Sequence, residues 1–298
     1  MMKNVSVIIP TYNREKLLPR AIESVLSQDF TGEIEIVIAD DGSTDDTLKI
    51  ARAYGNTVKI VAKPADCKTQ GPSSTRNRGI KAATQPYILF LDSDDYFFPG
   101  HIKKMAEAIE ENADYGYIFC RILEINEATA APTFRLWSKE KITQREVANL
   151  NIASHNVAQT NGFIFKKEVF DKVGVFHEDI YHGEDIDLWM RVSEFYKGNF
   201  SDHYGAALRR NGADQLTADS KESLLKIQQK VFRNALKRYF RLRLNNPYRL
   251  AKLLYINLYY VVIQLPLCKQ VFLWWYERKN KKADLAQEWY PLSYFIKD

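Results

Sequence analysis

The sequence predicts an α/β fold, a Rossmann-like three-layer α/β/α sandwich with a C-terminal helical extension. Two observations in the first hundred residues predict the sandwich. Short runs of aliphatic residues alternate with segments of helical periodicity. The runs are apolar throughout, as in parallel strands that are buried on both faces. A third observation, a change to basic composition near Asp219, predicts the extension.

The predicted elements follow one another in regular order, first a strand and then a helix. We expect strands over Val5–Pro10, Ile34–Ala39, Val58–Ala62 and Tyr87–Leu91, and helices over Glu15–Gln28, Thr44–Tyr54 and Ser73–Ala83. Ligands of such sheets bind beyond the carboxyl ends of the strands, so polar residues should follow the strands directly. Three of the strands do run into polar clusters, namely Thr11-Tyr12-Asn13, Asp40-Asp41-Gly42-Ser43 and Asp92-Ser93-Asp94-Asp95.

Length and cysteine content narrow the class of protein. A chain of 298 residues fits one large α/β domain with an appendage, or two small domains. The three cysteines, Cys67, Cys120 and Cys268, are far apart and form no CxxC pair, which is typical of free thiols in a reducing cytosol. The apolar run Val5–Pro10 is too short for a signal peptide.

The two acidic clusters each allow two interpretations. Carboxylates gathered at Asp92–Asp95 repel one another unless a cation lies among them, and Mg²⁺ and Mn²⁺ take oxygen ligands. The same residues also suit a turn followed by a helix N-cap. At Asp40 and Asp41 the strand end could bind a nucleoside, whereas Asp45 and Asp46 fit helix capping.

Two further segments carry charged residues at predicted helix starts. Arg76 offers a fork of donors to a base or phosphate, or else lies on a solvated helix face. Glu184 and Asp185 open an amphipathic helix, Ile186–Phe195. A carboxylate in this place can stabilise the helix dipole or serve as a general base, and the local sequence does not separate these roles.

Together these segments resemble the glycosyltransferase family 2 enzymes, whose fold is called GT-A. The matching stretches fall in the family's order between Val5 and Thr217: VSVIIPTYNRE, VIADDGSTDDT, STRNRGI, YILFLDSDDYFFPGHI, GFIFKKEVFDKVGVF and GEDIDLWMR. The resemblance implies a catalytic domain over residues 1–218 that transfers a sugar with inversion. The donor would be a nucleotide diphosphate sugar, with UDP expected. The acceptor would be a hydroxyl of a glycan or lipid-linked glycan in cell-surface polysaccharide biosynthesis.

The resemblance assigns donor-binding roles to residues at the strand ends. Pro10 and Tyr12 would contact or stack on the base of the donor. Asp41, with Asp40, would accept a hydrogen bond from the base, usually uracil. Arg76 would make a further donor contact.

The resemblance also implies a metal-dependent hexosyltransferase. Asp92 and Asp94 form the DXD-type element. Asp94 would bind Mn²⁺ or Mg²⁺, and Asp92 would lie near the ribose or a metal-bound water. Asp185 matches the catalytic base of the family.

One departure from the family lies in the stretch Leu208–Gly212. Asn211 stands where many relatives have a histidine that contacts metal or phosphate. Either Arg209 or Arg210 takes over the phosphate contact, or this loop has no such part. His203 lies nearby in sequence, and a structural role suits a lone histidine.

The tail, residues 219–298, has 16 basic and 6 acidic residues. Apolar side chains recur in it at helical spacing, at Leu225, Phe232, Leu236, Tyr239 and Phe240. The following apolar run, Leu250–Leu267, is shorter than the roughly 20 residues that a membrane span needs. It favours an anchor in the membrane plane, with Trp274, Trp275 and Tyr276 at headgroup depth. The alternative is a helical subdomain packed on the core or on a second subunit.

These features predict a cytoplasmic enzyme that is peripheral on the inner face of the cytoplasmic membrane and does not bind nucleic acid. Acceptor pockets would come from the loops Asn126–Asn161 and Asn199–Ala218. Two other functions compete with this one. A sugar nucleotidyltransferase would normally show a glycine-rich and basic N-terminal loop, which this chain lacks. A non-catalytic, membrane-associated nucleotide-binding scaffold would not need Asp94 and Asp185.

Overall fold

A computed structural model describes residues 3–126, 131–133, 159–180, 183–210, 221–242 and 247–262. Its strands are β1 (Val5–Thr11), β2 (Ile34–Asp40), β3 (Val58–Ala62), β4 (Tyr87–Phe90), β5 (Tyr96–Phe97), β6 (Tyr115–Asn126), β7 (Ala131–Thr133), β8 (Phe163–Lys166) and β9 (Lys197–Arg210). Its α-helices are α1 (Leu18–Leu26), α2 (Thr47–Ala53), α3 (Pro72–Ala82), α4 (His101–Glu110), α6 (Glu168–Val173), α7 (Glu184–Phe195), α8 (Lys221–Arg241) and α9 (Pro247–Val262). Short 3₁₀ turns lie at Gly55–Thr57 and Thr160–Gly162.

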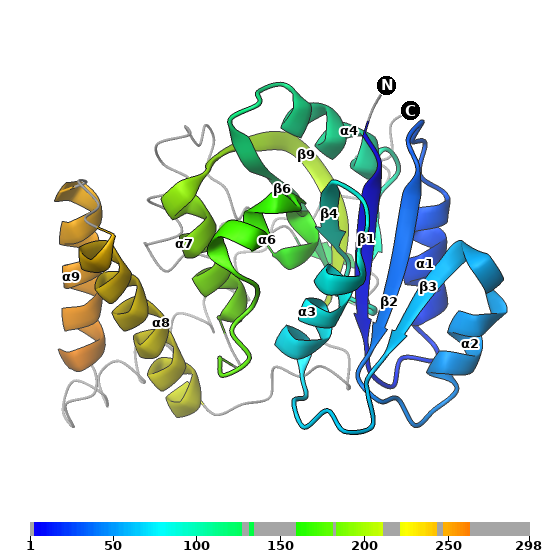
Figure 1. Cartoon of the computed structure of the whole chain (residues 1–298), viewed down its shortest axis with the longest axis horizontal. Helices are drawn as coiled ribbons and strands as arrows, with labels where there is room; N and C mark the ends of the chain where they lie inside the picture. Colours follow the sequence, from blue (N-terminus) through cyan, green and yellow to red (C-terminus); the bar gives the residue numbers. More distant parts are fainter. Residues whose placement is uncertain are drawn as a thin grey trace.

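All the described strands join in one sheet, in the order β3-β2-β1-β4-β8-β6-β9-β5, with β7 paired to β6 (Figure 1). The first four strands are parallel. The strands and helices predicted for the first ninety residues are all present. The carboxyl ends of β1, β2 and β4 therefore meet at one edge of the sheet.

The second half of the sheet is mixed, so a parallel sheet was predicted correctly only for its first half. β8 runs antiparallel to both β4 and β6, and β5 runs antiparallel to β9. β6 and β9 are parallel and pair over most of their length. The predicted strand pattern covered none of these later strands.

Side chains of the strands point alternately to two cores, which gives three layers. Val7 and Ile9 of β1 face one core, which α1, α2 and α4 cover. Ile8 faces the other core, which α3, α6 and α7 cover. In the second core Trp189 stacks on Phe163 at a centroid distance of 4.2 Å. The predicted three-layer α/β/α sandwich is confirmed.

The first helix of the tail packs on helix α7 of the sandwich instead of standing apart from it. Val231, Phe232 and Tyr239 of α8 are buried, in one cluster with Met190 of α7. Arg238 of α8 extends this contact with an ion pair of 3.0 Å to the buried Asp187 of α7. Phe232, Leu236 and Tyr239 of the apolar stripe thus pack in the cluster with α7, as the alternative interpretation of the tail required, whereas Phe240 is 60% exposed.

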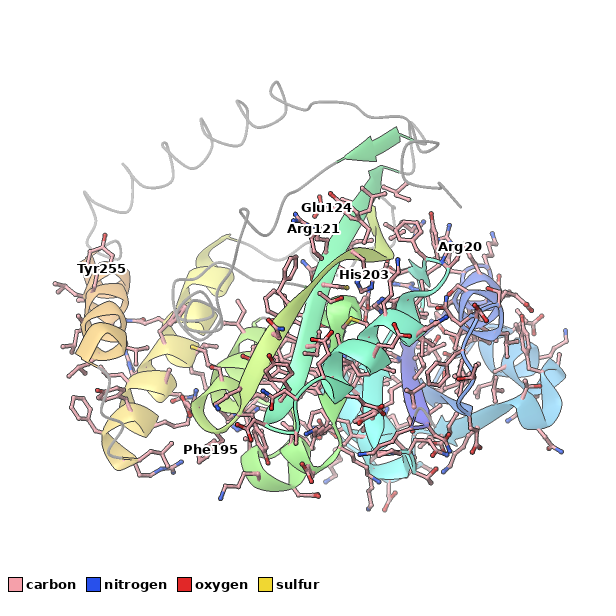
Figure 2. All side chains as sticks on the ribbon, turned by 90° about the horizontal axis from the view of Figure 1, so that it is seen from above. Arg20, Arg121, Glu124, Phe195, His203 and Tyr255 are labelled. Carbon is pink, nitrogen blue, oxygen red and sulfur yellow. The ribbon has the colours of Figure 1, made fainter. Side chains whose placement is uncertain are left out.

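The second helix of the tail, α9, packs on α8 through Leu253 and leaves another face open. Its exposed large apolar side chains are Leu254, Tyr255, Leu258 and Val261. Figure 2 shows Tyr255 projecting from α9 at one end of the molecule. No helix in the described ranges is long and apolar enough to cross a bilayer. Trp274, Trp275 and Tyr276 lie outside the described residues.

Candidate active site

The predicted site residues gather at the edge of the sheet where β1, β2 and β4 end. Pro10 is the second-last residue of strand β1, and Tyr12, just beyond the strand, is 51% exposed. We call the turn after β2, Asp40–Ser43, the first acidic turn. The turn after β4, Asp92–Asp95, is the second acidic turn. The two turns lie on either side of the end of β1, because β1 pairs with both strands.

Asp40 is engaged inside the first acidic turn. Its carboxylate is buried and accepts hydrogen bonds from the backbone N–H groups of Gly42 (2.8 Å) and Ser43 (3.0 Å). The Ser43 hydroxyl donates a third bond to it and accepts one from the Asn13 N–H. Gly42 has a φ of 90°, which suits glycine. These contacts hold the shape of the turn. Because they occupy the carboxylate of Asp40, Asp41 is the better candidate of the two for contact with a ligand.

Asp41 is held from the other side by helix α3. The backbone N–H of Gly71 donates to one carboxylate oxygen at 2.7 Å, and the Arg78 guanidinium donates to the other at 2.8 Å. Arg78 also reaches the carbonyl oxygen of Asp40. The sequence analysis assigned no role to Arg78, although it is the arginine that contacts the predicted nucleoside site.

Arg76 connects the second acidic turn to helix α7. It is buried, which contradicts a place on a solvated helix face. Its guanidinium donates to Asp92 at 2.7 Å and to Glu184 at 3.1 Å. Burial lowers the pKa of Arg76, but the carboxylates of Asp92 and Glu184 outweigh it and hold the group charged. Arg76 thus offsets part of the negative charge where the strand end meets α7.

The second acidic turn is fixed by residues that the sequence analysis did not single out. The Asn161 side chain donates to the buried carboxylate of Asp95 and accepts from the backbone N–H of Asp92 at 2.8 Å. The backbone N–H of Arg209 also donates to Asp95, at 2.8 Å. Burial and the charge of Asp94 raise the pKa of Asp95 well above its ordinary range. Asp95 and Asn161 therefore serve the shape of the turn.

Asp92 and Asp94 are the acids of this turn that keep partial access to solvent, with side chains 30% and 20% exposed. Arg14 lies 4.0 Å from the Asp94 carboxylate, and Arg20 donates to the Asp94 carbonyl oxygen. Burial, followed by the charge of Asp92, raises the pKa of Asp94. Negative charge is thus only partly offset here. Carboxylate oxygens with such excess charge fit a hard divalent cation such as Mg²⁺ or Mn²⁺.

Helix α7 brings three acids to its first turn, and each has different surroundings. Asp187 is fully buried between Arg191 (2.8 Å) and Arg238, which marks it as structural. Burial, and then the charge of Asp185, raise the pKa of Glu184 to about 7, against the lowering effect of Arg76. The Asp185 carboxylate accepts from the backbone N–H of Ile186. Glu184 and Asp185 thus form a carboxylate pair facing Asp92 across Arg76.

The end of β9 contributes Arg209 to the same region. Its charge lowers the pKa of Asp94, while its backbone is held by Asp95. Asn211 lies outside the described residues. His203 contacts His101 and Ser201, and the contacts found among the described residues do not join it to the acidic turns.

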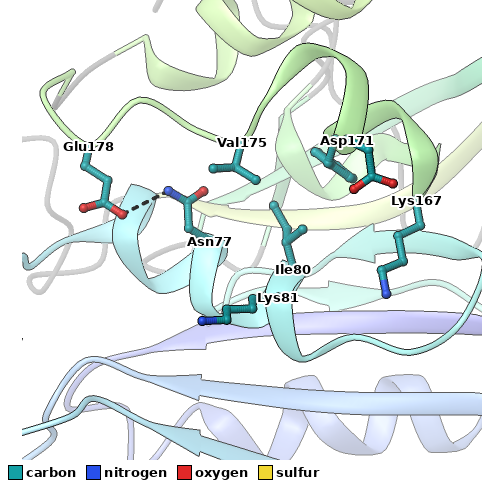
Figure 3. Close-up of a pocket in the computed structure, with 8 residues that line it drawn as sticks. Asn77, Ile80, Lys81, Lys167, Asp171, Val175 and Glu178 are labelled. Carbon is teal, nitrogen blue, oxygen red and sulfur yellow. Dashed lines mark hydrogen bonds between the residues drawn. The ribbon is translucent and has the colours of Figure 1, made fainter.

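An open pocket of about 450 Å³ lies on the outer side of α3, next to α6 (Figure 3). Residues of α3, α6 and the segment after α6 line it, including Asn77, Lys81, Lys167 and Glu178. Asn77 donates to Glu178 at 3.1 Å. None of the predicted site residues lines this pocket, so α3 turns Arg76 and Arg78 toward the strand ends and Asn77 away from them.

Comparisons with known proteins agree with this geometry. A model described as glycosyl transferase family 2 matches residues 6–174. A stretch of 112 residues is 39% identical to the poly(ribitol-phosphate) beta-N-acetylglucosaminyltransferase TarS of Staphylococcus aureus, covering 37% of this chain and 20% of TarS. A stretch of 192 residues is 29% identical to the GalNAc(5)-diNAcBac-PP-undecaprenol beta-1,3-glucosyltransferase of Campylobacter jejuni, covering 64% of this chain and 60% of that protein.

Solved structures share the fold. The crystal structure of S. aureus TarS in complex with UDP-GlcNAc superposes with a TM-score of 0.62 at 24% identity, covering 77% of this chain and 65% of that one. The mannosyltransferase PcManGT from Pyrobaculum calidifontis, in complex with GDP-Man and Mn²⁺, gives 0.58 at 16% identity, covering 86% and 70%. The matched part of this chain spans less than two thirds of the length of the two sequence relatives, TarS and the C. jejuni glucosyltransferase. Since the family model covers more than half of this chain and the GT-A sandwich is present, the chain belongs to glycosyl transferase family 2.

Proposed function

We propose that this protein transfers a sugar from a UDP-sugar to a hydroxyl of a glycan or lipid-linked glycan in cell-surface polysaccharide biosynthesis. The observation that carries the proposal is that helix α3 contacts both acidic turns: Arg78 pairs with Asp41, and Arg76 pairs with Asp92 and with Glu184, the neighbour of Asp185. The relatives are named for transfer to a polymer and to an undecaprenol-linked glycan, and one neighbour was solved with UDP-GlcNAc.

The strand ends would hold the nucleoside of the donor. The exposed Tyr12 ring can stack on a base, and Asp41 can accept from it, since each carboxylate oxygen has a second lone pair. Asp92 and Asp94 would hold a divalent cation, Mn²⁺ or Mg²⁺. Such a cation offsets charge on the leaving diphosphate. Arg209, whose charge acts on Asp94 and whose backbone is bound to Asp95, would contact the same phosphates.

Asp185 would act as general base. It takes the proton of the acceptor hydroxyl as that oxygen attacks the anomeric carbon. The bond from this carbon to the diphosphate breaks in the same step, so the configuration inverts. Glu184 would hold Arg76 in place and add to the negative field around Asp185. Because the two carboxyls interact, their titration belongs to the pair.

Two other functions remain to be separated from this one by assay. A panel of nucleotide sugars, tested for donor hydrolysis and transfer with and without Mn²⁺, distinguishes all three. We expect release of UDP from a UDP-sugar only with metal. Formation of a nucleotide sugar from a nucleoside triphosphate and a sugar phosphate would indicate a nucleotidyltransferase. Binding without turnover would indicate a scaffold.

The structure supports α9, rather than α8, as the segment that would contact a membrane. α8 packs most of its described apolar side chains in the cluster with α7 and exposes Phe240, whereas α9 exposes four large apolar side chains, Leu254, Tyr255, Leu258 and Val261. Apolar side chains on one helix can insert at a bilayer surface, and nearby basic residues add attraction to anionic lipid. A peripheral place on the inner face of the cytoplasmic membrane would bring the site near a lipid-linked acceptor.

Vesicle co-sedimentation tests this location. We expect the full chain to pellet with vesicles that contain anionic lipid, and the double variant Tyr255→Ser with Leu258→Ser to pellet less. Phe195→Ser, which changes an exposed aromatic residue on α7, is the matched control and should pellet with the vesicles as much as the wild type does. Equal sedimentation of all three chains would exclude α9 as the anchor.

A further inference from the structure

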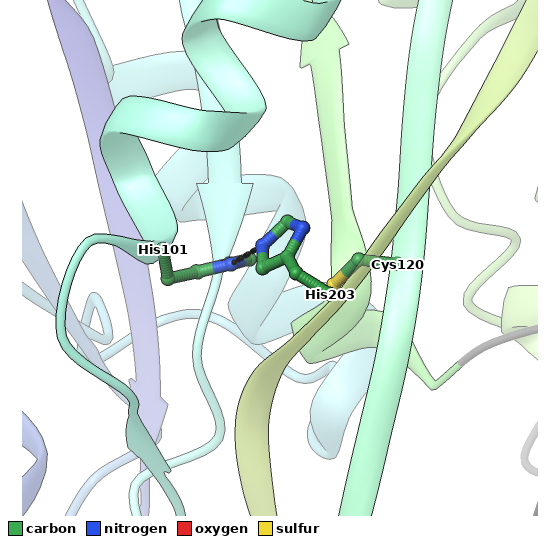
Figure 4. Close-up of side chains that lie close together, drawn as sticks. All are labelled: His101, Cys120 and His203. Carbon is green, nitrogen blue, oxygen red and sulfur yellow. Dashed lines mark hydrogen bonds between the residues drawn. The ribbon is translucent and has the colours of Figure 1, made fainter. Parts of the chain in front are cut away.

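A cluster of two histidines and a cysteine lies where α4, β6 and β9 meet, apart from the residues of the candidate active site (Figure 4). His101 begins α4, Cys120 lies on β6 and His203 lies on β9. One ligand atom from each of the three lies within 4.8 Å of the others. The Nδ1 of His101 and the Nε2 of His203 are 3.1 Å apart.

Gly205 allows these side chains to meet. A Cβ at this position of β9 would lie 2.3 Å from the His101 Nδ1 and 2.5 Å from the Cys120 Sγ. Any larger residue would therefore push the ring and the thiol apart. The Gly205 carbonyl oxygen also accepts from the Phe98 N–H at 2.9 Å, which holds the start of α4 against β9.

The spacing of the nitrogens suits a tetrahedral ion. Zinc binds imidazole nitrogen at about 2.0–2.1 Å and thiolate sulfur at about 2.3 Å, which puts two ligand nitrogens about 3.3 Å apart and nitrogen and sulfur about 3.6 Å apart. The measured 3.1 Å between the nitrogens is close to this value. The sulfur lies within 4.8 Å of both nitrogens, so each nitrogen–sulfur separation needs to shorten by about 1.2 Å at most to complete the geometry.

The surroundings orient one ring and leave one member of the cluster partly exposed. The Nδ1 of His203 lies 2.9 Å from the Ser201 hydroxyl, which directs its Nε2 toward His101. Metal-binding histidines commonly have such a partner on the nitrogen that faces away from the metal. His101 and Cys120 are buried, whereas His203 is partly exposed, so water can reach the cluster from that side.

We propose that His101, Cys120 and His203 bind one transition-metal ion of the zinc class, with water as a fourth ligand. On binding, the thiol loses its proton to solvent and the sulfur forms the bond to the metal. The ion would join the start of α4 to β6 and β9. Nitrogen and sulfur ligands separate this site from the all-oxygen second acidic turn, which suits Mg²⁺ or Mn²⁺.

Cobalt titration of the metal-stripped full chain tests the proposal, because a cobalt–thiolate bond gives a charge-transfer band that oxygen ligands do not give. We expect one band-forming ion per chain, displaced by zinc. The band should persist in Asp94→Ala and in Cys67→Ser, and should vanish in Cys120→Ser. Ser201→Ala should weaken cobalt binding about 10-fold or more, as loss of an outer hydrogen bond does.

Absence of a thiolate band in the folded wild-type chain would overturn the proposal, as would a band that survives in Cys120→Ser. Because Cys120→Ser could fail to fold, its circular dichroism is compared with that of the wild type. Zinc should also raise the melting temperature of Asp94→Ala but not that of Asp94→Ala combined with His203→Ala. An equal rise in both chains would place the bound zinc elsewhere and contradict the site.

Discussion

The two acidic turns have similar compositions, but their carboxylates differ in solvent exposure and in their bonding partners. In the first turn Asp40 is buried under three hydrogen bonds, and Asp41 is paired with Arg78. In the second turn Asp95 is buried in the same manner, yet Asp92 and Asp94 stay partly exposed beside each other. Each turn pairs one acid closely with an arginine, Arg78 with Asp41 and Arg76 with Asp92. The second turn adds Asp94, whose ion pair with Arg14 spans 4.0 Å. An acidic motif thus favours a cation site where the fold leaves a carboxylate without a close cation.

The largest expected effect comes from removing charge from the second turn. Asp94→Ala should lower metal-dependent transfer by about 10³-fold or more, because a catalytic metal contributes several kcal/mol to the transition state. Asp46→Ala removes an equal charge beside the first turn, where the side chain is 61% exposed, and should leave activity unchanged. Steady-state rates over a Mn²⁺ titration measure both. Equal losses of transfer rate in the two variants would show that activity depends on the removed charge and not on a metal ligand at Asp94.

Within the first turn, substitution of Asp40 should mainly lower stability, whereas substitution of Asp41 should mainly weaken UDP binding. Asp40→Ala removes three hydrogen bonds to a buried carboxylate and should lower the free energy of unfolding by about 3 kcal/mol. Asp41→Asn should cost about 1 kcal/mol but weaken UDP binding clearly. Urea unfolding and UDP titration measure the two properties. If Asp41→Asn bound UDP normally, the nucleoside role of Asp41 would be wrong.

Asn161 is the next point at which to disturb the second turn. Asn161→Ala leaves the Asp92 N–H and the buried Asp95 carboxylate each without one partner. We expect a loss of about 1–3 kcal/mol in the free energy of unfolding and weaker metal binding. Thr160→Ser, a small change at the neighbouring buried residue, is the control. Unchanged Mn²⁺ affinity in Asn161→Ala would mean that the turn keeps its shape without this clamp.

The smallest expected effect is a change in pH dependence at Glu184. Beside Asp185, folding raises the pKa of Glu184 from the ordinary 4.5 to about 7, so between these pH values the folded carboxylate pair holds a proton that the unfolded chain has lost. Its contribution to stability is therefore complete below about pH 4.5 and is lost as pH rises to about 7. Glu184→Gln should show a shallower fall in unfolding free energy over this range than the wild type. An exposed-site variant, Glu111→Gln, should follow the wild-type slope.

Local patterns predicted the first four strands and the polar strand ends, because period and composition act over a few residues. They did not predict Asn161, which is 69 positions from Asp92, since a contact between distant residues leaves no local pattern. Local patterns also did not predict that Arg78 contacts Asp41 while Arg76, on the same helix, contacts Asp92 and Glu184. These contacts depend on which distant residues lie beside each side of α3. The sequence pattern of α8 is equally compatible with contact to lipid and with contact to protein. The structure distinguishes the two, because Phe232, Leu236 and Tyr239 pack in one cluster with Met190 of α7.

The buried bridge between Arg238 and Asp187 has a consequence for where the chain can be shortened. Arg238 also reaches Glu194 at 3.2 Å, so it serves two acids of α7 at once. A fragment that ended at residue 218 would leave both acids short of a cation and expose Met190 to water. Breaking a buried ion pair by removing one partner is strongly destabilising. The smallest part of this chain that folds on its own would therefore extend through α8, at least to Arg241.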